Sequence, residues 1–394
     1  MTALEFGQPG PVAGKAGALP AADRLAAGWP TIDGEVDATY LSAALQRSGR
    51  LARIGDLNVV RLDGGRISAN VFSLKTGTGA FVLKKFLAEP WRVSLFGTAF
   101  NEPALWSSGF TRNLPAPLTC PTIDVAFHRE RGECWMLMDD VSAGVAPRGS
   151  FDESSFRRLL DGLADLHARH WGQSAESDEL PILTLEQHTA MFADPCAAVG
   201  GRTGHPEWVP EVLDKVLLFR TYVPVLLDVL GSADGDFYLD LCEHRQRWLA
   251  PLGRLPQTVI HGDLRRANIA ILPSSISLFD WDFACRAPAA ADLAWYWLLH
   301  FWCYPPNDGR TPEDREPLLA YYVERLHEAL GRQLDRAAFE RAWNLSWLKV
   351  LAQVGFCLAD PLVGTHSQED VTRVRAQCRK AIDRAKRIAD AHAV

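Results

Sequence analysis

VIHGDLRRANIAILPSSISLFDWDFACRAP, residues 259–288, is the stretch of the chain that decides its fold. Two short apolar runs in it, NIAIL and SISLF, predict two strands that pair back on each other as a hairpin. Asp263 and Asn268 stand before or at the start of the first strand, and Asp280 ends the second. We therefore expect the hairpin to bring the amide of Asn268 and the carboxylate of Asp280 side by side.

The spacing of these polar residues fits phosphoryl transfer from a nucleoside triphosphate. That reaction needs a carboxylate within hydrogen-bond reach of the attacking hydroxyl, and Asp263 is placed for this role. It also needs oxygen ligands for a Mg²⁺ ion that bridges the phosphates. Asn268 returns to the same point if the residues after Asp263 form a tight loop. The pattern His-Gly-Asp-x4-Asn with a downstream Asp therefore predicts a kinase-type catalytic loop and metal site.

The whole chain has the composition of an ordinary globular protein. At 394 residues it exceeds the usual size of one hydrophobic core, so two packed lobes are expected. The net charge of −7 gives no electrostatic footprint for nucleic acid or an acidic membrane surface.

The cysteines are scattered without zinc-finger spacing and are predicted to be free thiols. The beginning shows no signal-peptide pattern, and the longest apolar run, Leu293–Trp302, is too short to span a bilayer. We predict a cytoplasmic location.

The pattern changes from strand-like to helical along the chain. Residues 1–36 are rich in Gly, Pro and Ala and are predicted to be a loosely ordered lead-in. Residues 37–142 form the predicted N-lobe, with one amphipathic helix followed by strands in two hairpins. Residues 143–394 form the predicted C-lobe, which is mostly helical. The expected fold class is α+β, with a small β-rich lobe and a larger helical one.

The quoted stretch resembles the phosphotransferase family that includes aminoglycoside phosphotransferases and choline kinases, which are small-molecule kinases with a protein-kinase-like fold. That family writes its loop as H-G-D-x4-N where protein kinases write H-R-D-x4-N, and this chain has Gly262. The resemblance implies that Asp263 is the catalytic base and that Asn268 and Asp280 are metal ligands. It also implies that Asp292 braces the loop and that the two lobes form a protein-kinase-like fold.

The resemblance implies a nucleotide site in the N-lobe, which would bind ATP or GTP. In AFVLKKF, Lys84 matches the strand lysine that contacts the α- and β-phosphates, and Glu102 in the following helix is its natural partner. Lys85 is the alternative on the opposite face of the strand. In CWMLMDDV, backbone groups from Met138 to Asp140 would bind the purine.

The segment LDGGRISANVFSL, residues 62–74, matches the turn that covers the phosphates in that family. Glycines there would let the backbone approach a phosphate closely, although Gly-Gly alone also fits a bare hairpin turn. The residues expected to line this turn are Gly64, Gly65, Ser68 and Asn70.

Several charged residues of the quoted stretch stay open. Arg265 follows the base by two positions, where it either contacts the γ-phosphate or makes a surface salt bridge. Asp282 either shares the metal or has a solvated or loop-capping role, and the role of Arg266 is undefined. His261 is expected to order the loop by hydrogen bonding. His167 is expected to pack beneath the loop.

The predicted function is transfer of the γ-phosphate of ATP or GTP to a hydroxyl of a small molecule, with Mg²⁺. Its partners are then the nucleoside triphosphate and a small hydroxylated substrate, with no nucleic acid or membrane and an open oligomeric state. A protein kinase is the first alternative, but only eleven residues separate Asp280 from Asp292, too few for a long activation segment. An inactive kinase-fold binding protein is the second, although every catalytic group is present.

The acceptor is the least defined part of the prediction. Acidic residues after the first long helix would suit a cationic acceptor, or would form a solvated face. The run DATYLSAALQRSG is similar to a branch of the family related to ecdysteroid kinases, which would favour a neutral hydroxylated metabolite. The acidic residues are Glu176, Asp178, Glu179, Glu186 and Asp194.

Overall fold

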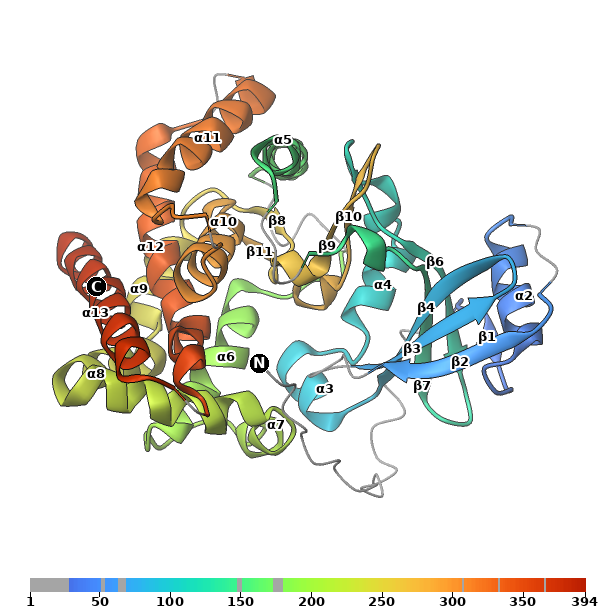
Figure 1. Cartoon of the computed structure of the whole chain (residues 1–394), viewed down its shortest axis with the longest axis horizontal. Coiled ribbons are helices and arrows are strands. Elements are labelled where there is room, and N and C mark those ends of the chain that lie inside the picture. The colour runs from blue at the N-terminus through green and yellow to red at the C-terminus, as the bar shows by residue number, and fades with distance from the viewer. Residues whose placement is uncertain are drawn as a thin grey trace.

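The strands of the first third of the chain pair into one sheet, and most of the remainder forms helices packed beside it (Figure 1). The two lobes predicted from the sequence pattern are therefore confirmed. The computed structural model describes residues 28–50, 54–62, 69–146, 151–172, 180–306, 308–331, 334–364 and 366–394.

The sheet of the smaller lobe has the strand order β1-β6-β7-β4-β3-β2, and only β1 and β6 run parallel. Both predicted hairpins are present: β3 and β4 join at the Gly-Thr-Gly turn, and β6 and β7 turn around Gly132. The strands are β1 (Thr31–Ile32), β2 (Leu57–Leu62), β3 (Ala69–Thr76), β4 (Gly79–Leu87), β6 (Thr122–His128) and β7 (Glu133–Asp139).

Each face of this sheet is covered by a helix. Helix α2 (Ala38–Arg47) is the predicted amphipathic helix, and it begins after Asp37, whose side chain caps it by accepting a bond from the amide of Tyr40. Its apolar side packs on the face that carries Leu83. Helices α3 (Pro90–Phe96) and α4 (Asn101–Ser107) lie on the other side, between the sheet and the helical lobe (Figure 1).

The structure differs from the prediction for the beginning of the chain at two residues. The segment 1–36 was expected to be loosely ordered, but Thr31–Ile32 forms β1 and pairs in parallel with Phe127 and His128. The amide of Phe127 also donates to the carbonyl of Pro30. A strand of two residues is too short to show a periodic pattern, and the surrounding Gly and Pro residues favoured an irregular segment. Residues 1–27 lie outside the described residues.

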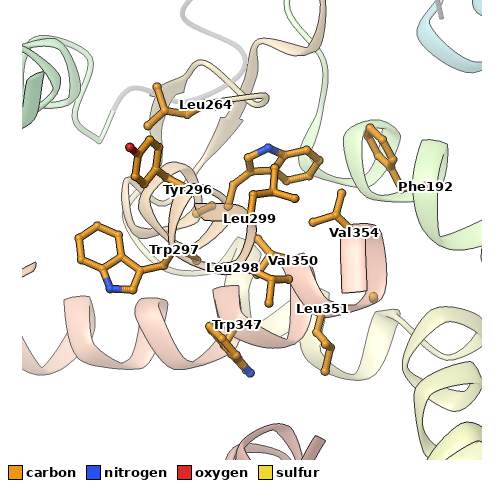
Figure 2. Packing of buried hydrophobic residues seen from close by; sticks show 14 of the residues in the cluster. Phe192, Leu264, Tyr296, Trp297, Leu298, Leu299, Trp347, Val350, Leu351 and Val354 are labelled. Carbon is orange, nitrogen blue, oxygen red and sulfur yellow. The ribbon is translucent and has the colours of Figure 1, made fainter. Parts of the chain in front are cut away.

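The larger lobe is built around one apolar core. In Figure 2, Leu298 and Leu299 lie above side chains of α12, among them Val350. Phe192 of α6 lies at the side of the same cluster. The helices are α5 (Glu153–Arg169), α6 (Leu185–Val199), α7 (Val209–Lys215), α8 (Leu217–Glu243), α9 (Gln246–Gly253), α10 (Ala290–Trp297), α11 (Glu316–Leu330), α12 (Arg336–Val354) and α13 (Gln368–His392), with a π-helix η5 (Leu298–Cys303) after α10 and a 3₁₀ helix η8 (Gly355–Leu362) after α12.

Helix α12 together with η8 is apolar and long enough to cross a membrane by composition alone, but 83% of its most apolar window is buried inside the protein. This is typical of a core helix. The bent pair α7 and α8 would meet the same test only if it formed one span.

The quoted stretch forms the predicted hairpin between the two lobes. β9 (Ile269–Ile271) and β10 (Ile276–Leu278) are antiparallel, and β5 (Leu118–Thr119) adds to β10 in parallel. β8 (Thr258–Ile260) and β11 (Cys285–Ala287) form a second antiparallel pair around it. Because β5 precedes the helical lobe in the chain, a shared sheet joins the lobes at the predicted catalytic loop.

Candidate active site

Asp263 lies at the centre of the loop, and both of its carboxylate oxygens have partners. Oδ1 accepts a hydrogen bond from the indole Nε1 of Trp295 at 3.1 Å. Oδ2 accepts from Asn268 Nδ2 and from Arg265 Nε, each at 2.9 Å. Burial raises the pKa of Asp263, and the Arg265 guanidinium opposes that effect. The carboxylate is thus oriented from three sides.

The backbone around Asp263 is held just as firmly. The amides of His261 and Gly262 donate to the two oxygens of Asp292 at 2.8 and 2.9 Å, in accord with the bracing role expected for that residue. Gly262 has a φ of +82°, and a Cβ there would stand 2.0 Å from the carbonyl oxygen of Phe283. The loop therefore needs glycine at this position, which explains why it reads H-G-D.

His261 lies behind Asp263 with both ring nitrogens in use. Nε2 contacts the carbonyl oxygen of Phe279 at 3.0 Å, and Nδ1 accepts from the amide of Asp263 at 3.3 Å. A carbonyl can only accept, so Nε2 carries the proton. Burial lowers the pKa of His261, which keeps the ring neutral. These contacts fit the loop-ordering role predicted from the sequence.

The predicted strand lysine lies next to the predicted metal carboxylate. Lys84 Nζ is 2.6 Å from Glu102 Oε2, so the ion pair expected between these two residues is confirmed. The same ammonium is 2.8 Å from Asp280 Oδ1. Burial alone would raise the pKa of Asp280, but the ammonium of Lys84 holds it at about 2. Segments from three parts of the chain thus meet at one cation.

Glu102 also positions the turn that carries Asp280. Its second oxygen, Oε1, accepts from the amides of Asp280 and Trp281 at 2.9 and 3.1 Å. Asp280 itself has a φ of +66°, a left-handed conformation that non-glycine residues rarely adopt. The strained turn is held by Glu102 and aims the carboxylate at Lys84.

Lys85 is not an alternative to Lys84 in this structure. It points to the α2 face of the sheet, where its ammonium lies 3.9 Å from the ring centroid of Trp135 and 5.1 Å from that of Phe72. Burial lowers the pKa of Lys85. Strand alternation therefore places only the first lysine of the pair on the side of Glu102.

The open residues of the quoted stretch have definite surroundings. Asp282 is not solvated: its Oδ1 pairs at 2.6 Å with Arg92 of α3, and both side chains are fully buried. Arg266 is buried as well, and its guanidinium donates to His300 and to the carbonyl of Tyr304. Arg265 keeps 43% of its side chain exposed. Of these residues, Arg265 alone combines contact with Asp263 and access to solvent.

Sequence reasoning missed two residues that contact the site. Trp295 belongs to the apolar run Leu293–Trp302 and carries no motif, yet its N–H orients Asp263. Arg92 lies 190 positions before its partner Asp282, in a helix without a motif. Neither residue had a local signal, because each depends on contacts between distant parts of the chain.

The predicted nucleotide-binding groups are only partly placed. Gly64, Gly65 and Ser68 lie outside the described residues, and Asn70 accepts a bond from Arg61 at 2.8 Å.

At the hinge, the amide of Asp139 donates to the carbonyl of Pro121, and that of Asp140 to the carbonyl of Ala80. Two of the amides expected to face a purine therefore already have partners in this conformation. Binding of a purine by residues from Met138 to Asp140 stays a prediction that rests on their other backbone groups.

The donor set of the predicted metal site fits a hard cation that keeps other ligands. Asp280 has 30% of its side chain exposed. Asn268 uses its Nδ2 on Asp263, which turns its Oδ1 away as a possible oxygen ligand. In the described part of the chain, no three His, Cys, Asp or Glu side chains cluster to hold a metal alone. Mg²⁺ commonly binds through one or two protein oxygens plus phosphates and water. The side-chain oxygens of Asp280 and Asn268 therefore fit the ligand preference of Mg²⁺.

The acidic residues expected near the acceptor are largely neutralised where they are described. Arg245 donates to Glu186 Oε1 at 2.8 Å and also pairs with Asp194. Glu176, Asp178 and Glu179 lie outside the described residues. The two described carboxylates therefore give no support to a cationic acceptor.

Comparisons with known proteins show one family and one fold. A profile of the phosphotransferase enzyme family matches residues 58–339. Among solved structures, an amicoumacin kinase in complex with AMP-PNP and Ca²⁺ is 12% identical, with a TM-score of 0.52 over 89% of this chain and 94% of that one.

Two further solved structures are similar over comparable lengths. The microcompartment-associated aminopropanol kinase is 14% identical over 90% of this chain and 98% of that one, with a TM-score of 0.49. The choline kinase from Streptococcus pneumoniae is 13% identical over 88% and 98%, with a TM-score of 0.44. No curated protein sequence matches the chain.

Proposed function

The chain belongs to the phosphotransferase enzyme family, whose members transfer phosphate to hydroxyl groups of small molecules, and from this premise we propose its reaction. It transfers the γ-phosphate of ATP or GTP to a hydroxyl of a small molecule, with Asp263 as the base. One observation carries this proposal: Lys84 contacts both Glu102 and Asp280 beside the loop that orients Asp263.

The proposed chemistry assigns each of these residues one task. Asp263 accepts the proton of the acceptor hydroxyl, whose oxygen forms a bond to the γ-phosphorus while the bond to the bridging oxygen breaks. Trp295 and Asn268 keep the carboxylate aimed during this step. Lys84 neutralises the phosphates that are not transferred.

Mg²⁺, held by Asn268 and Asp280, would supply charge neutralisation at the phosphates. Arg265 is the residue proposed to contact the γ-phosphate. Its guanidinium is exposed enough to reach a ligand while it still contacts Asp263.

The structure favours neither alternative. Every residue from Trp281 to Cys303 is buried, so the short segment after Asp280 packs into the core and offers no exposed activation loop for a protein substrate. An inactive binding protein would have no need of a strained Asp280 turn beside an intact Lys84–Glu102 pair.

The proposal is tested first by nucleotide binding and then by turnover. The purified chain should be stabilised against heat by Mg-ATP or Mg-GTP, and it should release nucleoside diphosphate when hydroxylated metabolites and antibiotics are screened as acceptors. Asp280→Ala should abolish transfer but leave the fold intact, whereas Asp240→Ala, an exposed change on α8, should leave the rate unchanged. Transfer at the wild-type rate in Asp280→Ala would contradict the assignment.

A further inference from the structure

A lysine without an acidic partner lies buried beneath the catalytic loop. Lys349 of α12 has no exposed surface, and its Nζ lies 2.7 Å from Gln353 Oε1 and 3.0 Å from His188 Nδ1. Within the described part of the chain no carboxylate forms an ion pair with it, and burial lowers its pKa to about 8. Fully buried lysines are rare because removing an ammonium from water is costly. The burial of Lys349 therefore indicates that its ammonium has a structural or functional role.

The partners of His188 leave it a single hydrogen-bonding arrangement. Its Nε2 is 3.0 Å from the carbonyl oxygen of Gly262, which can only accept, so Nε2 carries the proton. Nδ1 must then accept, and the ammonium of Lys349 can only donate. Burial, followed by the nearby charge of Lys349, lowers the pKa of His188 well below its usual value, so the ring is neutral. Lys349, by donating to Nδ1, thus acts together with the Gly262 carbonyl to select the tautomer that donates to Gly262.

The carbonyl that His188 holds belongs to the peptide bond joining Gly262 to Asp263. The N–H of that same peptide donates to His261 Nδ1, so the peptide plane is held on both edges. The preceding peptide is held by Asp292, which accepts the amide of Gly262. A rotation of either peptide would swing the Asp263 side chain.

A second contact leads from the same lysine to the carboxylate itself. Lys349 Nζ lies 5.8 Å from the ring centroid of Trp295, and the rings of His188 and Trp295 are 5.7 Å apart. Trp295 donates its N–H to Asp263 Oδ1. An ammonium over an indole face draws electron density from the ring, which strengthens the N–H as a donor. The backbone and the side chain of Asp263 thus both depend on neighbours of Lys349.

We propose that Lys349 and His188 are positioning residues, which hold the Gly262–Asp263 peptide and so set the direction of the Asp263 carboxylate toward the acceptor hydroxyl. The inference rests on the proposed function, since Asp263 is taken as the base. Neither residue touches substrate, and both act through the loop.

The tautomer of His188 can be measured without any substrate. In protein labelled with ¹⁵N-histidine, the His188 ring should show a protonated Nε2 and an unprotonated Nδ1, with His188→Gln assigning the signal. In Lys349→Met only the longer contact from Gln353 Nε2, at 3.4 Å, still reaches Nδ1, so the second tautomer should become populated. An unchanged tautomer in Lys349→Met would overturn the proposal. A wild-type chain without transfer would contradict the proposed function instead, and this measurement would still decide the positioning role.

The kinetic test separates positioning from stability. Lys349→Met should lower kcat by about tenfold to a hundredfold while KM for the nucleotide changes less than about twofold, because small displacements of a reacting group affect the chemical step most. His188→Gln keeps an amide donor for Gly262 and should retain most of the rate. Val350→Ala, the neighbouring buried change on α12, should lower Tm but leave kcat within about twofold.

If Lys349→Met does not fold, His188→Phe, which keeps a ring but removes both bonds, takes its place in the assay. Wild-type kcat in folded Lys349→Met or His188→Phe would overturn the proposal.

Discussion

The proposed catalytic loop around Asp263 is held differently on its two sides. On the side that is open to solvent, charged side chains pair with each other: Asp280 keeps 30% and Arg265 43% of the side chain exposed. On the side that faces α6 and α12, Asp292 and His188 have no exposed surface and bind backbone groups whose donor and acceptor roles are fixed. A charged side chain can give up its ion pair to contact a charged ligand. The Gly262–Asp263 peptide, by contrast, is hydrogen-bonded through both its carbonyl and its N–H, which restrains its rotation. We therefore call the side with Asp280 and Arg265 the binding side, because its charges can contact a ligand. We call the side with Asp292 and His188 the holding side, because it fixes the backbone of the loop.

The largest effect is expected on the holding side, at Gly262. Gly262→Ala places a Cβ 2.0 Å from the carbonyl oxygen of Phe283 and also strains a positive φ, so it should lower the free energy of unfolding by about 4 kcal/mol. Gly172→Ala is the matched control, because its φ is +71° but no atom lies within 4 Å of the added Cβ. It should lose only about 1 kcal/mol in the same denaturant titration. Equal losses would show that the loop is not tightly packed there.

On the binding side, two adjacent lysines give the comparison. Lys84→Met should lower kcat/KM about 10²- to 10³-fold, because it removes the cation between Glu102 and Asp280. Lys85→Met, one residue away on the opposite face, should change kcat/KM by less than about threefold. The two variants are compared in one steady-state assay. Similar losses in both would remove the distinction between the two faces.

The buried lysine predicts a rise of stability with pH. The folded pKa of Lys349 is about 8, below the value of an unfolded lysine, so the unfolded chain binds more protons between about pH 8 and 10.5. The free energy of unfolding of the wild type should therefore rise relative to Lys349→Met across that window, by roughly 3 kcal/mol at most. Parallel pH profiles of the two proteins, measured by urea unfolding, would contradict a buried ammonium.

Asp280, on the binding side, predicts a smaller effect of the same sign at low pH. Its folded pKa of about 2 lies below the unfolded value, so its contribution to stability is present above about pH 4 and is lost as the pH falls toward 2. Asp280→Asn, which tolerates the left-handed turn, should therefore differ from the wild type by about 1 kcal/mol at pH 5, since solvent screens the pair. The difference should shrink by pH 2.5 in the same unfolding assay. A constant difference would assign the loss to another cause.

The parts that the sequence predicted are those with local patterns. The β9–β10 hairpin follows from two apolar runs, whereas the pairing of Lys84 with Glu102 was implied by the resemblance to a family. The resemblance to a family supplied the roles of Asp263, Asn268 and Asp280, which spacing alone left less definite.

The parts that it did not predict depend on distant contacts. Arg92 meets Asp282 across 190 positions, and Lys349 meets His188 across 161. Each of these residues looks like an ordinary surface charge in a helical pattern, since burial is decided by how helices pack. β1 was missed for a similar reason, because two residues gain strand structure only from their partner β6.

The role of Asp263 is tested most directly by single-turnover transfer of labelled γ-phosphate to an acceptor found in the screen, with wild type and Asp263→Asn compared. Asp263→Asn keeps a group that can accept from Trp295 but cannot take up a proton, so transfer should fall by about 10²- to 10⁴-fold while the nucleotide still raises the melting temperature. Transfer by Asp263→Asn at the wild-type rate would show that the loop carries its base elsewhere.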